Sequence, residues 1–371
     1  MHCLSIARAL LRQGTDLTLI QVSDTIGDEL QFAPMAVRAA PPSRIHYLLD
    51  GVGVLRAVQS ICEGLAIAAV VGWSHEAAFL PGYLRRSGIP FGMIAAFDYG
   101  LLDMRRTRFR AVKALADHWF RMRPLRRADV VFAPSDYSSR QLIEVMGVDP
   151  SNVRKAHLGV DPRFLEIPRA LRSAASRFVF FGELTEVKGI RDLLLALARV
   201  RELGGSSWEL QVAGWGDVES LRDAASELGI IEQVRFLGRL DHQELRAVLE
   251  WADLAILPSR AESFGLSIAE AQAAGLPVIS CKTGAVPEIV DDGSTGWLVE
   301  PGDTEALASA VLAAMSEPEL AFRMGMDGRK RVATKFTWKT TAEQMMEGLL
   351  RRTTQDQERA RSGAGPGISP E

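Results

Sequence analysis

Cysteine is scarce in this chain, and its spacing excludes two classes of protein. The 371 residues include three cysteines, Cys3, Cys62 and Cys281, which lie far apart in the sequence. Disulfide-stabilised small folds and zinc clusters both need several closely spaced cysteines. The sequence therefore predicts neither of them, and its cysteine content is typical of a protein from a reducing cytoplasm.

Long apolar runs and an excess of one charge are also absent. The longest apolar run, residues 65–73, is much shorter than the roughly 18 residues of a membrane-spanning helix. No basic stretch leads into an apolar one near residue 1, so we expect a cytoplasmic protein. With 43 basic and 46 acidic residues the formal net charge is −3, which does not favour a nucleic-acid partner for the chain as a whole.

Metal-ligand patterns are missing too. The six histidines do not pair at the short spacings that metal sites use, and no Asp-x-Asp triplet occurs. We therefore expect no metal site and no bound cofactor.

Short apolar runs alternate with helical patterns from residue 177 onward. This alternation predicts a parallel sheet covered by helices on both faces. The predicted strands are 178–181, 209–213, 234–237, 254–257, 278–280 and 297–299, and predicted helices include 190–203, 218–228 and 243–251. Weaker runs in the first half predict strands at 17–22, 68–72, 91–95, 130–133 and 153–157.

The pattern as a whole predicts an α/β protein with two Rossmann-like domains that face each other across a cleft. Such a tandem favours a ligand at the carboxyl ends of the strands. We expect the domains at residues 1–160 and 177–335, with an irregular linker at 161–176. A last helix at 336–352 and a polar, disordered tail at 353–371 complete the expected organisation.

The segment from Pro258 to Ala271 carries the most chemical information. It follows a predicted strand and opens a helix at Gly265, where free backbone amides and the helix dipole favour a phosphate. Glu262 lies in the loop before this helix and Glu270 lies within it. Carboxylates in these places can accept hydrogen bonds from sugar hydroxyls, although Glu270 alone could also belong to a solvated helix face.

The two glutamates, with seven residues between them, resemble the E-x7-E motif of the retaining glycosyltransferases of family 4, which have the GT-B fold. The similarity covers residues 177–338 closely and the first half more loosely. It implies that Glu262 contacts the donor sugar and Glu270 the nucleotide ribose. It also implies that residues 263–266, which are Ser263, Phe264, Gly265 and Leu266, contribute to donor binding through their backbone.

A second segment, residues 181–189, is similar to the family's G-R-x5-K-G sequence, which binds the donor diphosphate. Gly182 and Lys188 match it, and Lys188 would neutralise the diphosphate. Glu183 stands where the family usually has arginine. Glu183 therefore points away from the diphosphate, or another cation substitutes for the arginine, or donor binding is weak.

Two further loops resemble parts of the family's nucleotide pocket. Gly214 and Gly216 follow a predicted strand and would line the pocket, although a tight turn alone also explains them. Arg239 and Leu240 resemble the loop that packs on the base.

The acceptor side matches the family less well. The family often has a histidine after the strand at 91–95, and here that place holds Ala96 or Phe97, next to Asp98. His75, after the preceding predicted strand, is a second candidate. Asp98 and His75 are therefore candidate catalytic residues, beside Glu262 and Lys188.

Residues 104–127 are rich in basic side chains, with nine Arg or Lys and one acid. Apolar residues recur at helical spacing within this segment, so it predicts a basic amphipathic helix. Such a helix can lie on an anionic membrane surface or pack on its own domain with a solvated basic face. Peripheral contact with the inner face of a membrane is therefore one of two readings.

Residues 4–22 read as a helix, a glycine stop and a strand. In the family a strand precedes that helix, so we expect the chain as given to lack the first strand of its first domain. Met1 is then an internal start, or the sheet has closed in an unusual way.

The resemblance implies a glycosyltransferase that moves a sugar from a nucleotide sugar, such as a UDP- or GDP-sugar, to a hydroxyl acceptor with retention of configuration. The acceptor is an unknown sugar or a lipid-linked molecule. A non-catalytic GT-B scaffold and a nucleotide-sugar epimerase stay open as alternatives.

Overall fold

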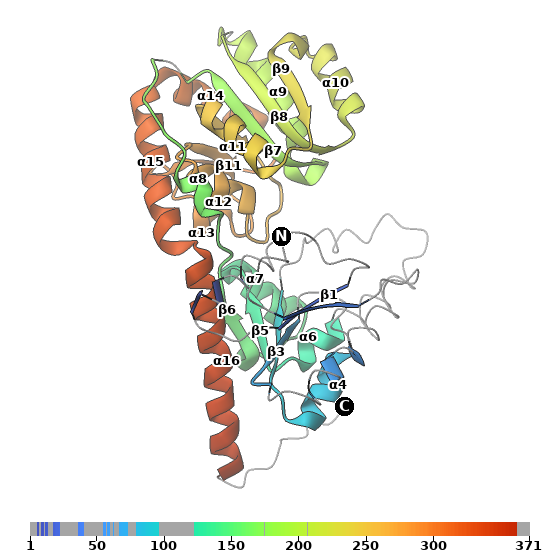
Figure 1. The fold of residues 1–371 in the computed structure, drawn as a ribbon. Helices are drawn as coiled ribbons and strands as arrows, with labels where there is room; N and C mark the ends of the chain where they lie inside the picture. The colour runs from blue at the N-terminus through green and yellow to red at the C-terminus, as the bar shows by residue number, and fades with distance from the viewer. Residues whose placement is uncertain are drawn as a thin grey trace. The chain divides into compact units, whose positions relative to one another are not determined.

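The computed structural model forms two compact units (Figure 1). The first unit comprises residues 1–157 and 338–371, and the second comprises residues 158–337. The structure describes residues 122–173, 175–205 and 207–361, and before them residues 6, 9, 10, 12, 13, 18–22, 36–40, 55, 56, 58, 59, 62, 67–72 and 79–95.

The second unit is built on a six-stranded parallel sheet with helices packed on it. The strand order is β12-β11-β10-β7-β8-β9. The strands are β7 (Arg177–Leu184), β8 (Glu209–Gly216), β9 (Val234–Gly238), β10 (Leu254–Leu257), β11 (Val278–Cys281) and β12 (Gly296–Val299). The helices are α8 (Pro162–Leu165), α9 (Ile190–Glu202), α10 (Val218–Glu227), α11 (His242–Trp251), α12 (Leu266–Ala273), α13 (Val286–Ile289), α14 (Thr304–Ser316) and α15 (Pro318–Lys335).

The apolar runs of this half form the central strands because they can be buried on both faces. All four residues of β10 and all four of β11 are buried. Helix α9 packs against α14, and α12 packs against α15 and α8. The six strands predicted from the sequence are the six that form, and the prediction of a two-domain α/β protein with parallel sheets is confirmed.

The strand order places a reversal point in the middle of this sheet. The chain runs outward from β7 through β8 to β9, and then returns to the other side of β7 with β10. In sheets of this kind a ligand is expected at the carboxyl ends of the strands where the order reverses, so a site is expected at the loops that leave β7 and β10.

The segment expected to be an irregular linker, residues 161–176, packs on the second unit. It contains α8, and Ile167 is fully buried. Arg169 donates to the carbonyl oxygens of Leu249 and Ala252, at the end of α11. Arg329, from α15, donates to the carbonyls of Ala274 and Ile167. These guanidinium groups satisfy helix-end carbonyls that would otherwise lack partners, which fixes the segment in place.

The first unit contains a smaller parallel sheet of order β3-β4-β5-β6 and a separate pair of parallel strands, β1 and β2. The strands are β1 (Thr18–Val22), β2 (Ala36–Ala40), β3 (Val70–Gly72), β4 (Phe91–Ile94), β5 (Val130–Ala133) and β6 (Val153–Lys155). The described helices include α4 (Leu80–Ser87), α6 (Arg123–Arg127) and α7 (Asp136–Arg140).

Strand β2 was not predicted, because its sequence, Ala-Val-Arg-Ala-Ala, contains one residue with a high strand preference. The expectation that the chain as given lacks a strand before residue 4 stays a prediction.

Helix α16 (Trp338–Arg361) belongs to the first unit, although it comes last in the sequence. Ala342, Met345 and Leu349 join the same apolar cluster as Phe132 of β5. The placement of Gly348 lets the helix approach closely, because a Cβ at this position would meet the Phe132 ring at 2.8 Å.

The helix is longer than the sequence analysis indicated. We expected it to end at residue 352 and the chain beyond to be disordered, but helical backbone continues to Arg361. Residues 352–361 contain Gln, Glu and Arg and no Gly or Pro, and such a composition supports helix even without an apolar face. The rest of the expected tail, residues 362–371, lies outside the described residues.

Met345 offers a test of how α16 contributes to the first unit. Met345→Ala removes a side chain that is 2% exposed, so the free energy of unfolding of this unit should fall by about 2–5 kcal/mol. Glu343→Ala, on the exposed face of the same helix, should change it by less than about 0.5 kcal/mol. Urea denaturation of both variants measures this, and equal effects would show that the packing of α16 does not stabilise the unit.

Candidate functional site

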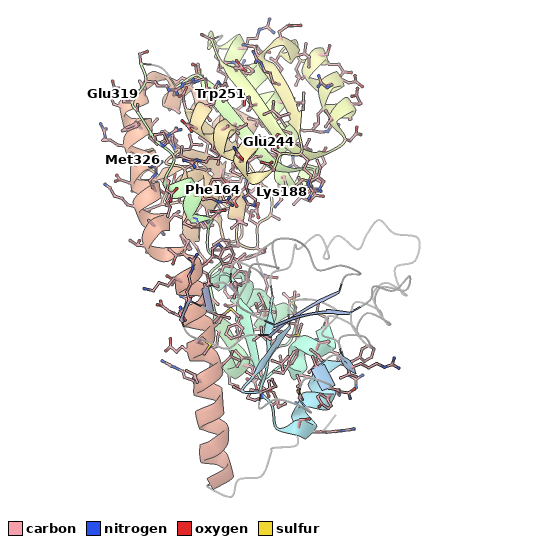
Figure 2. All side chains as sticks on the ribbon, in the orientation of Figure 1. Phe164, Lys188, Glu244, Trp251, Glu319 and Met326 are labelled. Atoms are coloured by element: carbon pink, nitrogen blue, oxygen red, sulfur yellow. The ribbon has the colours of Figure 1, made fainter. Side chains whose placement is uncertain are left out.

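The loop after β7 carries Lys188 to the reversal point of the sheet. A short 3-10 turn, Glu186–Lys188, is followed by Gly189, which has a φ of 72° and starts α9. A Cβ on Gly189 would overlap the carbonyl oxygen of Pro258, so only glycine lets this loop touch the loop after β10. Figure 2 shows Lys188 at the edge of the second unit where β7 ends.

The loop after β10 holds Glu262 against Lys188. The Lys188 Nζ atom lies 2.9 Å from Glu262 Oε1, and the Ser259 hydroxyl donates to the same oxygen at 2.9 Å. Glu262 is 5% exposed and Ser259 is 3% exposed, while the Lys188 side chain is 19% exposed. A buried carboxylate is thus compensated by a less deeply buried cation, on the two loops that flank the reversal point.

Backbone contacts fix where Glu262 stands. Its carbonyl oxygen accepts a hydrogen bond from the Ala285 amide at 3.1 Å, and a Cβ on Gly284 would overlap that same oxygen. In the same loop, Arg260 donates two hydrogen bonds, at 2.6 and 2.7 Å, to the buried carboxylate of Asp192 in α9. The glutamate therefore lies on a loop that α9 and the segment before α13 hold on two sides.

Helix α12 begins directly after this loop. Gly265 has a φ of 97° and precedes the first helical residue, Leu266. Phe264 is buried and its ring lies 5.6 Å from that of Phe336, edge to face. The first turn of a helix presents backbone amides without helical acceptors, so this end favours an anion beside Lys188.

Glu270 lies one turn further along α12, in an electrostatic setting unlike that of Glu262. Its carboxylate forms no hydrogen bond or ion pair with the part of the chain that the structure describes. Burial and the nearby Asp161 carboxylate raise the pKa of Glu270 to about 8. The group is therefore largely protonated at neutral pH, in which form it can both donate and accept hydrogen bonds.

The ends of β7, β8 and β9 bring the other predicted donor residues together. Gly182 and Gly214 are register partners, and a Cβ on Gly214 would overlap the Gly182 carbonyl oxygen. Glu183 is the register partner of Trp215, which is exposed. The guanidinium of Arg239, from the loop after β9, lies 5.6 Å from the centre of the Trp215 ring.

Glu183, which stands where the family usually has arginine, has an unpaired carboxylate that forms no ion pair or hydrogen bond among the described residues. Gly216 is the register partner of Leu184, and Leu240 follows Arg239 at the partly exposed end of the β9 loop.

Part of the predicted site lies outside the described residues. This holds for His75, Asp98 and most of the basic segment, residues 104–121. Arg123 and Arg127 lie on α6, and Arg126, next along that helix, donates to the Met146 carbonyl at 2.6 Å. Burial and the neighbouring Arg123 and Arg85 lower the pKa of Arg127.

Two kinds of feature are absent from the described residues. No helix among them is long and apolar enough to cross a bilayer. They also contain no group of three or more His, Cys, Asp or Glu side chains placed to hold a metal ion.

The sequence analysis missed two residues that shape this site. Ser259 lies three residues before Glu262 and bonds to its carboxylate, and a polar residue directly after a buried strand was the available signal. Asp161 influences Glu270 from a segment 109 positions earlier, and no local pattern could have indicated that.

Comparisons with known proteins identify the family of the chain. A model of glycosyltransferase family 4 matches residues 1–164, and a model of group 1 glycosyl transferases matches residues 168–331. The chain belongs to glycosyltransferase family 4. The Lys188 and Glu262 loops both lie within the group 1 match.

Individual family 4 relatives align over part of their length. A glycogen synthase of Mycobacterium tuberculosis is 33% identical over 220 residues, which are 59% of this chain and 53% of the relative. The chain spans about half the length of the curated relatives that it matches.

Solved structures show the GT-B fold at low sequence identity. Sucrose-phosphate synthase from Thermosynechococcus elongatus has a TM-score of 0.75 at 21% identity and covers 95% of this chain and 92% of its own. Anabaena HepE, solved with UDP and glucose, has a TM-score of 0.70 at 20% identity and covers 94% of each chain.

The raised pKa of Glu270 predicts a pH-dependent stability. Between the ordinary value of about 4.5 and the folded value of about 8, the folded protein keeps a proton that the unfolded chain has released. The free energy of unfolding should therefore fall as pH rises through this window. Glu270→Gln should remove this loss, so the variant gains at least about 1.4 kcal/mol relative to wild type between pH 5 and pH 8.

Urea denaturation at pH 5, 6.5 and 8 measures the difference. Glu319→Gln, which removes an exposed carboxylate of α15 in the same unit, serves as the control. A constant difference between Glu270→Gln and wild type at all three pH values would contradict the raised pKa.

Proposed function

We propose that this protein transfers a sugar from a nucleotide-sugar donor to a hydroxyl acceptor, with retention of anomeric configuration. The observation that carries the proposal is the Lys188–Glu262 pair at the reversal point of the second sheet. One loop brings a cation and the other a carboxylate to the same place, and the N-terminus of α12 adjoins them. Retention is proposed from family membership.

The diphosphate of the donor is assigned to Lys188 and the N-terminus of α12. Transfer breaks the bond between the sugar and the diphosphate, so negative charge grows on the leaving phosphate oxygen. A lysine ammonium and oriented backbone amides stabilise this charge most strongly where water is excluded. Lys188 is mostly buried and is held within reach of that position by the 3-10 turn that contains it.

The hydroxyl groups of the donor are assigned to the two glutamates. Glu262 has one carboxylate oxygen bound by Lys188 and Ser259, which leaves Oε2 to accept a hydrogen bond from a sugar hydroxyl.

Glu270 has no described partner and is assigned to the nucleotide ribose. Trp215 and Arg239 would contribute a flat surface and a positive charge at the base end.

The donor is proposed to be a UDP- or GDP-sugar, and HepE, of similar fold, supports the first of these because it was solved with UDP and glucose. The acceptor is proposed to be a sugar or a lipid-linked molecule with a free hydroxyl group. Contact of residues 104–127 with an anionic membrane is also proposed, because this segment is rich in Arg and Lys.

Glu183 favours one rival, a non-catalytic GT-B scaffold. A carboxylate at the end of β7 would repel a bound diphosphate, which favours a scaffold that binds none. A nucleotide-sugar epimerase is the second alternative. Calorimetric titration with UDP, GDP and ADP distinguishes a nucleotide-binding protein from a scaffold that binds none. A panel of nucleotide sugars, scored by donor hydrolysis and by product analysis, then distinguishes transfer from epimerisation.

Lys188→Gln tests the diphosphate assignment. Glutamine keeps a hydrogen-bond donor for Glu262 but removes the positive charge, so the affinity for nucleoside diphosphate should fall about tenfold to a hundredfold. Lys330→Gln removes an exposed lysine of α15 and should leave the affinity unchanged. Isothermal calorimetry measures both, and an unchanged affinity in Lys188→Gln would overturn the assignment.

Glu183→Arg tests whether the reversed charge faces the diphosphate. Arginine would replace a repulsive carboxylate with a bidentate cation, so we expect nucleoside diphosphate to bind at least about tenfold more tightly. Glu227→Arg makes the same charge change at the exposed end of α10 and is the control. If both variants gain equally, the effect is one of overall charge and Glu183 does not face the ligand.

A further inference from the structure

Glu262 and the proposed ligand make competing demands on Lys188. In the structure the Lys188 ammonium lies 2.9 Å from Glu262 Oε1. The same ammonium is the group assigned to the diphosphate. An inference about this competition rests on the proposed function, because it requires that a diphosphate binds at this site.

The competition matters because Glu262 is deeply buried. Its carboxylate is 5% exposed, and its described side-chain partners are Lys188 and the Ser259 hydroxyl. If Lys188 turns to a diphosphate, Glu262 keeps one neutral hydrogen bond and little access to water. A buried charge that loses its partner is strongly destabilised.

Nucleotide sugars and free nucleoside diphosphates differ in the hydrogen-bond donors that they offer to Glu262. A nucleotide sugar brings hydroxyl groups that can donate to the carboxylate and replace the lost ammonium. A free nucleoside diphosphate has hydroxyl groups only on its ribose, which is assigned to Glu270, so it offers none to Glu262. We propose that Glu262 competes with the diphosphate for Lys188, so that the site takes an intact nucleotide sugar in preference to a free nucleoside diphosphate.

Ser259 is the positioning residue in this arrangement. It is 3% exposed, and its backbone amide donates to the Leu257 carbonyl at 2.9 Å, which fixes it directly after β10. Its hydroxyl holds Oε1 whether or not Lys188 does. Ser259 thus keeps the carboxylate aimed at the sugar while the lysine is engaged with the diphosphate.

The exchange also bears on product release. Transfer removes the sugar and leaves a nucleoside diphosphate. The bound ligand then no longer donates sugar hydroxyls to Glu262, and its binding weakens. Renewed pairing of Glu262 with Lys188 then accompanies departure of the diphosphate. Competition of Glu262 for Lys188 thus weakens binding of the nucleoside diphosphate product and limits product inhibition. No part of the chain has to unfold for this.

Glu262→Gln tests the direction of the effect. Glutamine has the same shape but no charge, so it no longer competes for Lys188. Isothermal calorimetry with UDP, GDP and ADP should show tighter binding, by about tenfold for the base that the wild type accepts, which corresponds to about 1.4 kcal/mol. The matching nucleotide sugar, UDP-glucose, GDP-mannose or ADP-glucose, should bind no more tightly than to wild type.

A matched control is Glu186→Gln, on the same turn as Lys188. Glu186 is paired with Arg191 at 2.9 Å, and its side chain is 62% exposed. Its loss removes one negative charge from the same loop, where solvent screens it, and should change the affinity less than about twofold. Glu262→Asp, whose shorter carboxylate withdraws from Lys188, repeats the test should the glutamine variant fail to fold.

Ser259→Ala adds a second, opposite signature. With Ser259 removed, the carboxylate that Lys188 leaves behind has no described partner, so nucleoside diphosphate should bind more weakly than to wild type. In the Glu262→Gln background the same change should have little effect. A serine that served only the stability of the loop would weaken binding equally in both backgrounds.

The outcomes separate this inference from the proposed function. Wild-type protein that binds none of the three diphosphates or their sugars overturns both. Wild-type protein that binds, together with a Glu262→Gln variant whose diphosphate affinity is unchanged or reduced, overturns the competition alone. That second result would mean that Lys188 serves Glu262 and the diphosphate at once through different ammonium protons.

Discussion

One ion pair joins the two loops on which the whole proposed site depends. In this sheet the chain runs to one side of β7 and then returns to its other side with β10, so the loops after these two strands leave from the same edge at the reversal point. Nothing in the sheet itself obliges those loops to stay close. The ion pair between Lys188 and Glu262, together with the close approach of Gly189 to Pro258, holds the two loops together. It also places an ammonium and a carboxylate at the carboxyl edge of the sheet.

The two glutamates of the motif show how one short segment can create two different acids. Glu262 sits in a loop, faces an ammonium and shares an oxygen with a serine hydroxyl. Glu270 sits on the helix that follows, and burial together with the charge of Asp161 raises its pKa to about 8. Eight positions of chain therefore separate a carboxylate held by a cation from a carboxyl group that keeps its proton at neutral pH.

Much of the second unit could be predicted because its signals are local. Strands β7 and β10 contain runs of buried apolar residues. Glycines mark where tight turns begin helices, as at Gly189 and Gly265. Lys188 and Glu262 were singled out because their segments resemble two motifs of the family, and the roles that the resemblance implies for them stay predictions.

What could not be predicted depends on contacts between distant segments. The role of Asp161 beside Glu270 requires the fold, and so does the packing of residues 161–176, which two arginines attach to helix ends. The length of α16 was underestimated because its last residues are polar on all sides, a pattern that is typical of both solvated helix and disorder.

The discontinuous first unit has a consequence for how this protein is made. Helix α16 supplies Ala342, Met345 and Leu349 to an apolar cluster whose other members, from Ile6 to Ala156, leave the ribosome at least 186 residues earlier. At common rates of synthesis, those earlier residues wait on the order of ten seconds or more for their partner. During that interval the second unit, which is continuous in sequence, can complete its own core, while the first exposes the face of β5 that α16 will cover. The nascent chain therefore presents a transient apolar surface, and chaperones or premature association would act on it before the last helix arrives.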